Sequence, residues 1–171
     1  YQPVYFLQGE NTYYIDEVAN KLLNSVLDES EKDFNQTIFY GKETSIDVVL
    51  DCAKRYPLMS PFQLIVVREA QHLSRTIDQL ENYFKDPVST TILVFCFKGK
   101  KLDKRKSLAK ILLKNQYLFD ADSVKDYQLP DWVLNCAKQN EVNLNQKAAV
   151  LISEFLGNDL AAIEKNIQKL K

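Results

Sequence analysis

A phosphate-binding loop is the first chemistry to test, because a glycine closes the first apolar run of the chain. Such a loop follows the pattern Gly-x-x-x-x-Gly-Lys-Ser/Thr, whose backbone amides hold phosphate and whose lysine and hydroxyl engage the terminal phosphate and Mg²⁺. Gly9 stands at the first position of this pattern. Tyr14, Ile15 and Asp16 stand where the second glycine, the lysine and the hydroxyl residue belong. A bulky ring, an apolar side chain and an anion do not hold a triphosphate, so this phosphate loop is degenerate.

Other catalytic and metal-binding residues are also missing from their expected places. The third predicted strand is followed by Arg68, where a nucleotide hydrolase needs an acidic residue for Mg²⁺. The single histidine, His72, has no Gly-x-Ser-x-Gly nucleophile motif near it. Cys52, Cys96 and Cys136 lack CxxC spacing, which predicts buried thiols in a reducing compartment rather than disulfides or a zinc site. We therefore expect no catalytic residue, no metal site and no cofactor.

Two prolines bracket an apolar pair just before the third predicted strand. Pro57 and Pro61 stiffen the backbone around Leu58 and Met59, which do not continue the apolar stripe of the preceding helix. A partly exposed pair of this kind at a helix end would anchor in a hydrophobic pocket of a partner, and methionine adapts well to such surfaces. The alternative is a loop that tucks both side chains under the edge of the sheet. Spacing alone leaves both interpretations open.

Charge is unevenly spread along a chain whose net charge is −1. Residues 1–51 carry three lysines against ten acidic residues, whereas residues 98–114 carry eight lysines and arginines against Asp103 alone. Cations at the start of a helix oppose its dipole, so helix stability does not explain the run at 98–106. Contact with DNA phosphate or with an acidic partner would explain it, and a solvated face is the alternative. The candidate contact residues are Lys100, Lys101, Lys104 and Arg105.

The elements that must position these residues alternate between strand and helix. Short apolar runs predict strands at 4–7, 37–40, 63–67, 91–97 and 117–119. Helical spacing predicts helices at 11–27, from a cap at Thr44 or Ser45 to Ala53, at 73–84, and after a cap at Asp103. Strands that are apolar throughout and alternate with helices indicate a parallel sheet covered on both faces.

The pattern becomes purely helical at Leu129–Pro130, with caps predicted at Asn145 and Asp159. We therefore expect two domains, an α/β domain at 1–128 and a small three-helix lid domain at 129–171. Apolar residues make up 46% and charged residues 26% of the chain, as in soluble globular proteins. With no apolar stretch of about 18 residues and no charged-then-apolar leader, we expect a cytoplasmic protein without membrane contact.

Taken together, these motifs resemble those of one family, the delta subunit of the bacterial DNA polymerase III clamp loader. The segments that carry the resemblance are Val4-Tyr5-Phe6-Leu7-Gln8-Gly9-Glu10, Ile15-Asp16-Glu17, Val66-Val67-Arg68-Glu69-Ala70, Lys101-Leu102-Asp103-Lys104-Arg105, Leu156-Gly157-Asn158-Asp159-Leu160 and Lys169-Leu170. The resemblance covers the whole chain as the first two of the family's three domains. It implies an AAA+-like parallel-sheet domain with a degenerate phosphate loop, then a helical lid, with a helical collar domain that we expect to be absent from this fragment.

The resemblance implies a non-catalytic, protein-binding role in DNA replication, within the DNA polymerase III holoenzyme. In the family, an apolar pair at the tip of the helix before the third strand inserts into a pocket of the ring-shaped sliding clamp, the beta subunit, and opens the ring for loading onto primed DNA. By position this pair is Leu58 and Met59, and Met59 departs from the phenylalanine of many members. The implied partners are the clamp and the delta prime and tau or gamma loader subunits, with DNA contacted indirectly.

Two alternative functions stay open at this point. One is an ATP-binding loader ATPase of the same architecture, against which Tyr14, Ile15 and Arg68 argue. The other is an autonomous DNA-binding module that uses residues 98–106, against which the net charge of −1 argues. The run also lacks interleaved aromatic residues, so base stacking is not expected of it.

Overall fold

All the strands of the chain run in the same direction within one sheet. The computed structural model describes residues 1–171 and contains five strands: β1 (Val4–Gly9), β2 (Gln36–Tyr40), β3 (Gln63–Arg68), β4 (Thr91–Lys98) and β5 (Leu118–Ala121). Their order across the sheet is β2-β3-β4-β1-β5, and every neighbouring pair is parallel. The parallel sheet predicted from the apolar runs is therefore confirmed.

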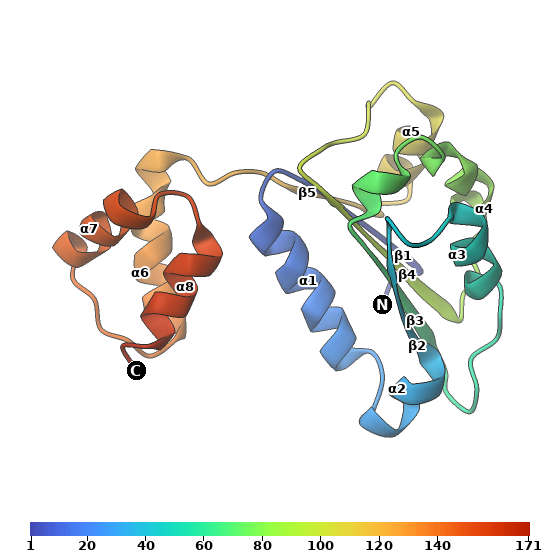
Figure 1. Cartoon of the computed structure of the whole chain (residues 1–171), viewed down its shortest axis with the longest axis horizontal. Coiled ribbons are helices and arrows are strands. Elements are labelled where there is room, and N and C mark those ends of the chain that lie inside the picture. Colours follow the sequence, from blue (N-terminus) through green and yellow to red (C-terminus); the bar gives the residue numbers. More distant parts are fainter. The chain divides into compact units, whose positions relative to one another are not determined.

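Helices cover both faces of this sheet (Figure 1). The α-helices that connect the strands are α1 (Thr12–Ser25), α2 (Glu29–Asn35), α3 (Ile46–Ala53), α4 (Glu81–Lys85) and α5 (Ser107–Lys114). Alternate residues of β4 point into two separate cores: Phe95 packs with residues of α3, α4 and α5, and Val94 packs with residues of α1. Burial on both faces explains why the strands are apolar throughout rather than alternating.

The segment predicted as one helix at 73–84 is divided into three short pieces. These pieces are the 3₁₀ helices η1 (Ala70–Leu73) and η2 (Ile77–Leu80), followed by α4. The residues on which the prediction relied, Leu73, Ile77, Leu80 and Phe84, are nevertheless all buried in one core. They recur at intervals of three and four residues, and a chain of 3₁₀ turns keeps such positions on one face as an α-helix does.

The prediction that Asp103 caps the basic helix is wrong, because α5 begins only at Ser107. The Asp103 carboxylate instead accepts hydrogen bonds from the backbone N–H of Arg105, at 2.9 Å, and from the Arg105 guanidinium. Its carbonyl oxygen accepts the N–H of Lys106 at 3.0 Å. Asp103 therefore closes a turn ahead of the helix, which is the other local structure that aspartate favours.

The chain divides by its internal contacts into two units, a sheet unit at Tyr1–Ala121 and a helical unit at Asp122–Lys171. The helical unit contains the short 3₁₀ helix η3 (Asp126–Gln128) and the helices α6 (Leu129–Gln139), α7 (Gln146–Leu156) and α8 (Leu160–Gln168). Both predicted caps are formed: Asn145 accepts from the N–H of Ala148 at 2.8 Å, and Asp159 accepts from that of Ala162 at 3.0 Å. No helix of either unit has the length and apolar character needed to cross a membrane.

Candidate partner-binding site

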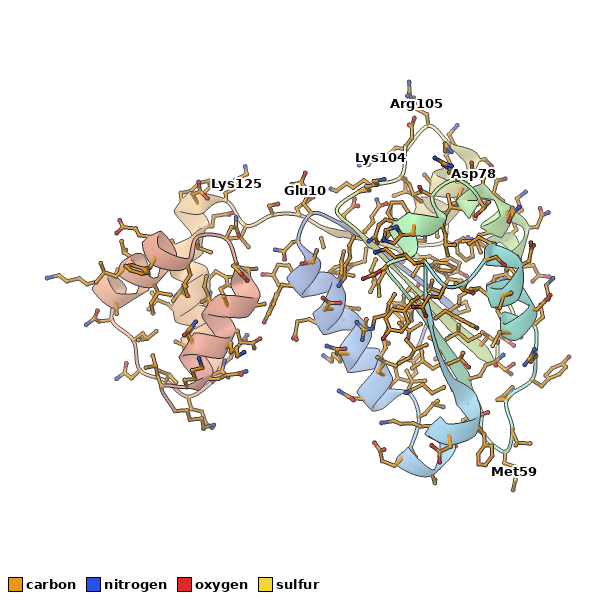
Figure 2. The ribbon with its side chains drawn as sticks, in the orientation of Figure 1. Glu10, Met59, Asp78, Lys104, Arg105 and Lys125 are labelled. Carbon is orange, nitrogen blue, oxygen red and sulfur yellow. The ribbon has the colours of Figure 1, made fainter.

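Two candidate surfaces of the sheet unit lie at opposite ends of its strands. The segment between α3 and β3, residues 54–62, leads into the start of a strand; we call it the proline loop. The segment after β4, residues 98–106, follows the end of a strand; we call it the basic segment. Since parallel strands share one carboxyl edge, the two segments are kept apart by the length of the sheet. Figure 2 shows Met59 at one end of the sheet unit and Lys104 and Arg105 at the other.

The apolar pair of the proline loop is exposed. Leu58 has 56% and Met59 has 96% of its surface open to solvent. This exposure excludes the alternative in which the loop tucks both side chains under the sheet. The pair does not lie at the tip of a helix, because α3 ends at Ala53 and the flanking Pro57 and Pro61 prevent helical continuation. A short non-helical loop therefore presents the pair.

The centre of the proline loop is held by a side chain from another element. The Asn35 side chain, at the end of α2, accepts the Leu58 N–H through Oδ1 at 2.6 Å and donates through Nδ2 to the Leu58 carbonyl oxygen at 2.9 Å. Met59, the next residue, has a φ of +51°, a left-handed conformation that non-glycine residues rarely adopt. The loop is thus fixed next to the residue whose side chain is most exposed.

Both ends of the proline loop are also hydrogen-bonded. The buried Gln63 side chain donates through Nε2 to the carbonyl oxygen of Arg55 and to Thr91 Oγ1, the latter at 2.8 Å. The Ser60 hydroxyl donates to the Phe62 carbonyl oxygen at 3.0 Å and lies 3.4 Å from the Phe62 N–H. The backbone of the proline loop is therefore largely ordered before a partner binds.

Two further exposed aromatic side chains belong to the proline loop and to α2. Tyr56 precedes the apolar pair in the proline loop, and Phe34 precedes Asn35 in α2; both are exposed. A group of exposed large apolar residues on two segments that are hydrogen-bonded to each other is typical of a protein-interaction surface. This edge of the sheet therefore has the composition of a partner-binding site.

Ion pairs occupy the carboxyl edge, where the degenerate phosphate loop lies. The Asp16 carboxylate in α1 lies 3.1 Å from the Arg68 guanidinium at the end of β3 and 2.6 Å from Lys98 Nζ at the end of β4. Arg68 also donates to Asn20 Oδ1 at 2.8 Å. The position expected for an Mg²⁺-binding acid thus carries a guanidinium, which repels a metal cation. The structure contains no group of three His, Cys, Asp or Glu side chains placed to hold a metal ion.

The thiol of Cys96 in β4 is fully buried beside these charges. Burial raises the pKa of the Cys96 thiol to about 11, and the nearby Arg68 lowers it by less. At pH 8 such a thiol is thiolate in only about one molecule in a thousand, and the thiolate is the reactive form.

We therefore expect Ellman's reagent at pH 8 to modify the half-buried Cys52 first and Cys96 only after unfolding. The time course of thionitrobenzoate release measures this order, and a Cys52→Ser variant should lose the fast phase. Rapid labelling of Cys96 in the native protein would contradict the expectation.

The basic segment carries many cations that already have acidic neighbours. The pairs formed within it or beside it are Lys98–Asp16, Lys101–Asp120, Arg105–Asp103 and Lys106–Asp78, at N–O distances from 2.6 to 3.9 Å. Two of the charged groups show the effect: hydrogen bonds from Arg105 lower the pKa of the Asp103 carboxyl, and the bond to Asp78 raises the pKa of Lys106. Lys100 and Lys104 are exposed. The positive field of the segment is weaker than its count of cations indicates.

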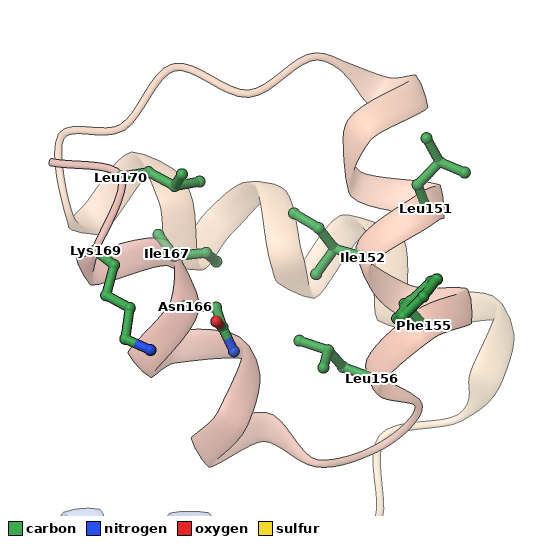
Figure 3. Close-up of a pocket in the computed structure, with 8 residues that line it drawn as sticks. All are labelled: Leu151, Ile152, Phe155, Leu156, Asn166, Ile167, Lys169 and Leu170. Atoms are coloured by element: carbon green, nitrogen blue, oxygen red, sulfur yellow. The ribbon is translucent and has the colours of Figure 1, made fainter.

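The helical unit has a pocket of its own, with a volume of about 510 Å³ (Figure 3). It lies between α7 and α8 and is lined by Leu151, Ile152, Phe155, Leu156, Asn166, Ile167, Lys169 and Leu170. Its lining is mostly aliphatic, with one amide and one ammonium group, so it suits an apolar side chain and not a nucleotide or a metal ion.

Sequence reasoning found the exposed pair but missed Asn35, and it missed the helix that carries Asn35. A signal for this helix exists in the spacing Asp28-x-x-Glu31, which is a helix-start pattern. In the structure the Glu31 carboxylate accepts the Asp28 N–H at 3.0 Å.

The fold and the edges of the sheet together define a class of protein. A five-stranded parallel sheet with a degenerate phosphate loop, followed by three helices, is an AAA+-like module in which ion pairs take the place of the nucleotide-binding residues. The family model described as DNA polymerase III, delta subunit, matches residues 5–122, and the chain belongs to this family.

Individual relatives agree with this assignment. The chain is 28% identical to DNA polymerase III subunit delta of Bacillus subtilis (strain 168), over 98% of this chain and 51% of that protein. The structure of the Bacillus subtilis DNA clamp loader delta protein superposes with a TM-score of 0.79 at 28% identity, over 98% of this chain and 52% of the other. The chain therefore spans about half the length of the relatives it matches.

A more distant likeness supports the fold alone. A DNA polymerase III gamma subunit-related protein of Thermotoga maritima has a TM-score of 0.54 at 13% identity, over 98% of this chain and 53% of that one. The family resemblance and the AAA+-like fold class expected from the sequence are both confirmed.

Proposed function

We propose that this chain is the sliding-clamp-binding part of a clamp-loader subunit and that it has no catalytic site of its own. In this proposal Leu58 and Met59 insert into an apolar pocket on the ring-shaped clamp. The observation that carries the proposal is an exposed apolar pair on a loop whose backbone is fixed by hydrogen bonds. Such a pair gains free energy on burial and loses little conformational entropy, because the loop is already ordered.

The chain opens the clamp by differential binding. A protein that binds the open ring more tightly than the closed ring shifts the equilibrium toward the open form, and no bond need be broken for this. The other loader subunits, delta prime and tau or gamma, supply the ATP-dependent step by exposing or covering the proline loop. Primed DNA is then contacted mainly by the assembled loader.

Binding of the 171-residue chain to its cognate sliding clamp tests this function directly. We expect saturable binding by isothermal calorimetry, with a dissociation constant of about 10 µM or tighter. No measurable heat at two well-separated temperatures, with clamp concentrations well above this value, would reject the proposal, because the heat of burying apolar surface changes with temperature.

The absence of a nucleotide site is the second part of the proposal. Arg68 and Lys98 are both paired with Asp16, so neither of these cations is available to bind a phosphate group. We expect no saturable heat when ATP and Mg²⁺ are added to the chain in the calorimeter, and no shift of the melting temperature. A saturable ATP isotherm would instead support the loader ATPase alternative.

A role for the basic segment stays a prediction of the sequence. Lys100, Lys101, Lys104 and Arg105 contact either DNA phosphates or a partner subunit in that prediction. Because several cations of the segment are paired with carboxylates, an autonomous DNA-binding module is the weaker alternative.

A further inference from the structure

The main chain at the centre of the proline loop depends on one side chain from outside the loop. Asn35 belongs to α2, and its side chain bonds both the N–H and the carbonyl oxygen of Leu58, 23 positions away in the chain. Asn35 has only 4% of its surface exposed. Water is thus poorly placed to take over these two bonds when the amide is removed.

The geometry of this contact fixes the orientation of the peptide groups at Leu58. A single amide group that accepts from the N–H and donates to the C=O of one residue pairs with it as a neighbouring strand would. Asn35 Nδ2 also lies 3.2 Å from the carbonyl oxygen of Glu31, which ties the amide to α2. The Leu58 peptide groups are therefore oriented by a helix of the sheet unit rather than by the loop itself.

The conformation that follows Leu58 needs such support. Met59 has a left-handed backbone, with a φ of +51°, although it has a side chain. Residues other than glycine stay in this region only when the surrounding structure imposes it. Ser60 and Gln63 hold the ends of the loop, but neither bonds to Leu58 or Met59.

We propose that Asn35 is a positioning residue, which holds Leu58 and Met59 in their exposed, binding-ready arrangement. The inference rests on the proposed function for its effect on the clamp, and on the loop geometry for the positioning itself. When the amide is lost, the loop samples other conformations and only a fraction of molecules presents the pair correctly. The apparent dissociation constant rises by the inverse of that fraction.

Two variants test whether the side-chain amide of Asn35 positions the loop. Asn35→Ala removes both hydrogen bonds, whereas Asn35→Asp keeps the size and the acceptor but places a carboxylate oxygen against the Leu58 carbonyl oxygen. We expect each variant to bind the sliding clamp about tenfold more weakly than the wild type. Asn140→Ala is the matched control, because it removes an asparagine bonded to the carbonyl oxygen of Cys136 within the helical unit; it should bind as the wild type does.

A double-mutant cycle separates positioning from a general structural effect. In a background where Leu58 and Met59 are already alanine, Asn35→Ala should cause no further loss of clamp affinity, because nothing is left to position. A full tenfold loss in that background would overturn the inference. So would wild-type affinity in both single variants.

Hydrogen exchange at the Leu58 amide decides the positioning without the clamp. We expect the Leu58 N–H to be protected in the wild type and to exchange at least tenfold faster in Asn35→Ala, which removes its acceptor, with protection in β4 unchanged. If the wild-type chain does not bind the clamp but this exchange behaves as expected, the proposed function is wrong and the positioning stands. Unchanged Leu58 exchange in Asn35→Ala rejects the positioning, whether or not the chain binds the clamp.

Discussion

Replacing Leu58 and Met59 together by alanine is expected to weaken binding to the sliding clamp by at least about thirtyfold. Two side chains that fill an apolar pocket at the centre of an interface contribute about 2 kcal/mol or more to the free energy of binding. Both are exposed in the free protein, so their truncation should change the free energy of unfolding by no more than about 0.5 kcal/mol. Calorimetric titration with the clamp, beside a thermal melt of each protein, measures both quantities.

The matched control for this variant lies on the helical unit. Leu151 and Phe155 are also an exposed aliphatic residue and an exposed large apolar residue, but they line the pocket between α7 and α8. The double substitution Leu151→Ala with Phe155→Ala should leave clamp affinity unchanged. A Leu58/Met59 variant that still binds at wild-type affinity would move the clamp contact elsewhere on the protein.

Gly9→Ala is expected to cost the sheet unit at least about 3 kcal/mol of its free energy of unfolding. Gly9 has a φ of +136°, which residues with a side chain rarely adopt, and a Cβ there would lie 2.2 Å from the carbonyl oxygen of Ala121. Relief of this clash requires β1 and β5 to separate, although they are paired at this point. The glycine that resembles the start of a phosphate loop is thus required by close packing between two strands.

Gly99→Ala provides the comparison for this substitution. Gly99 also has a positive φ, of +70°, but a Cβ there meets nothing within 4 Å. Its replacement should cost only about 1 kcal/mol, the strain of the backbone alone. Urea unfolding, followed by short-pulse labelling of the buried Cys96 thiol in a Cys52→Ser background and located by mass spectrometry, reports on the sheet unit in both variants. Equal losses for the two glycines would show that the contact with Ala121 is not what restricts Gly9.

The parts of the structure that were predicted correctly depend on burial patterns along the chain. The strands are recognisable because both faces of the sheet are covered, which leaves runs such as residues 91–97 apolar at every position. The caps at Asn145 and Asp159 are recognisable because an Asn or Asp directly before a helix accepts the N–H three residues further along the chain. The apolar pair is recognisable because it lies between two prolines and does not continue the apolar stripe of the preceding helix.

The parts that were missed depend on contacts between segments far apart in the sequence. Nothing near Asn35 indicates that its amide will meet Leu58, since the two are joined only when β2 and β3 pair and bring their starting ends together. The error at Asp103 is of another kind, because aspartate favours both helix caps and turns and only the partner N–H distinguishes them. The apolar positions of residues 73–84 are likewise compatible with 3₁₀ turns and with an α-helix.

The separation of the proline loop from the basic segment has a mechanical consequence. The six residues of β3 and the eight of β4 make the sheet about 20 to 26 Å long in the strand direction, and both of its faces are packed with side chains. Close-packed interiors are nearly incompressible, so such a sheet serves as a stiff spacer between its two ends. A force applied by a partner at the carboxyl edge would therefore rotate the sheet and the proline loop together as a rigid body, instead of bending the sheet.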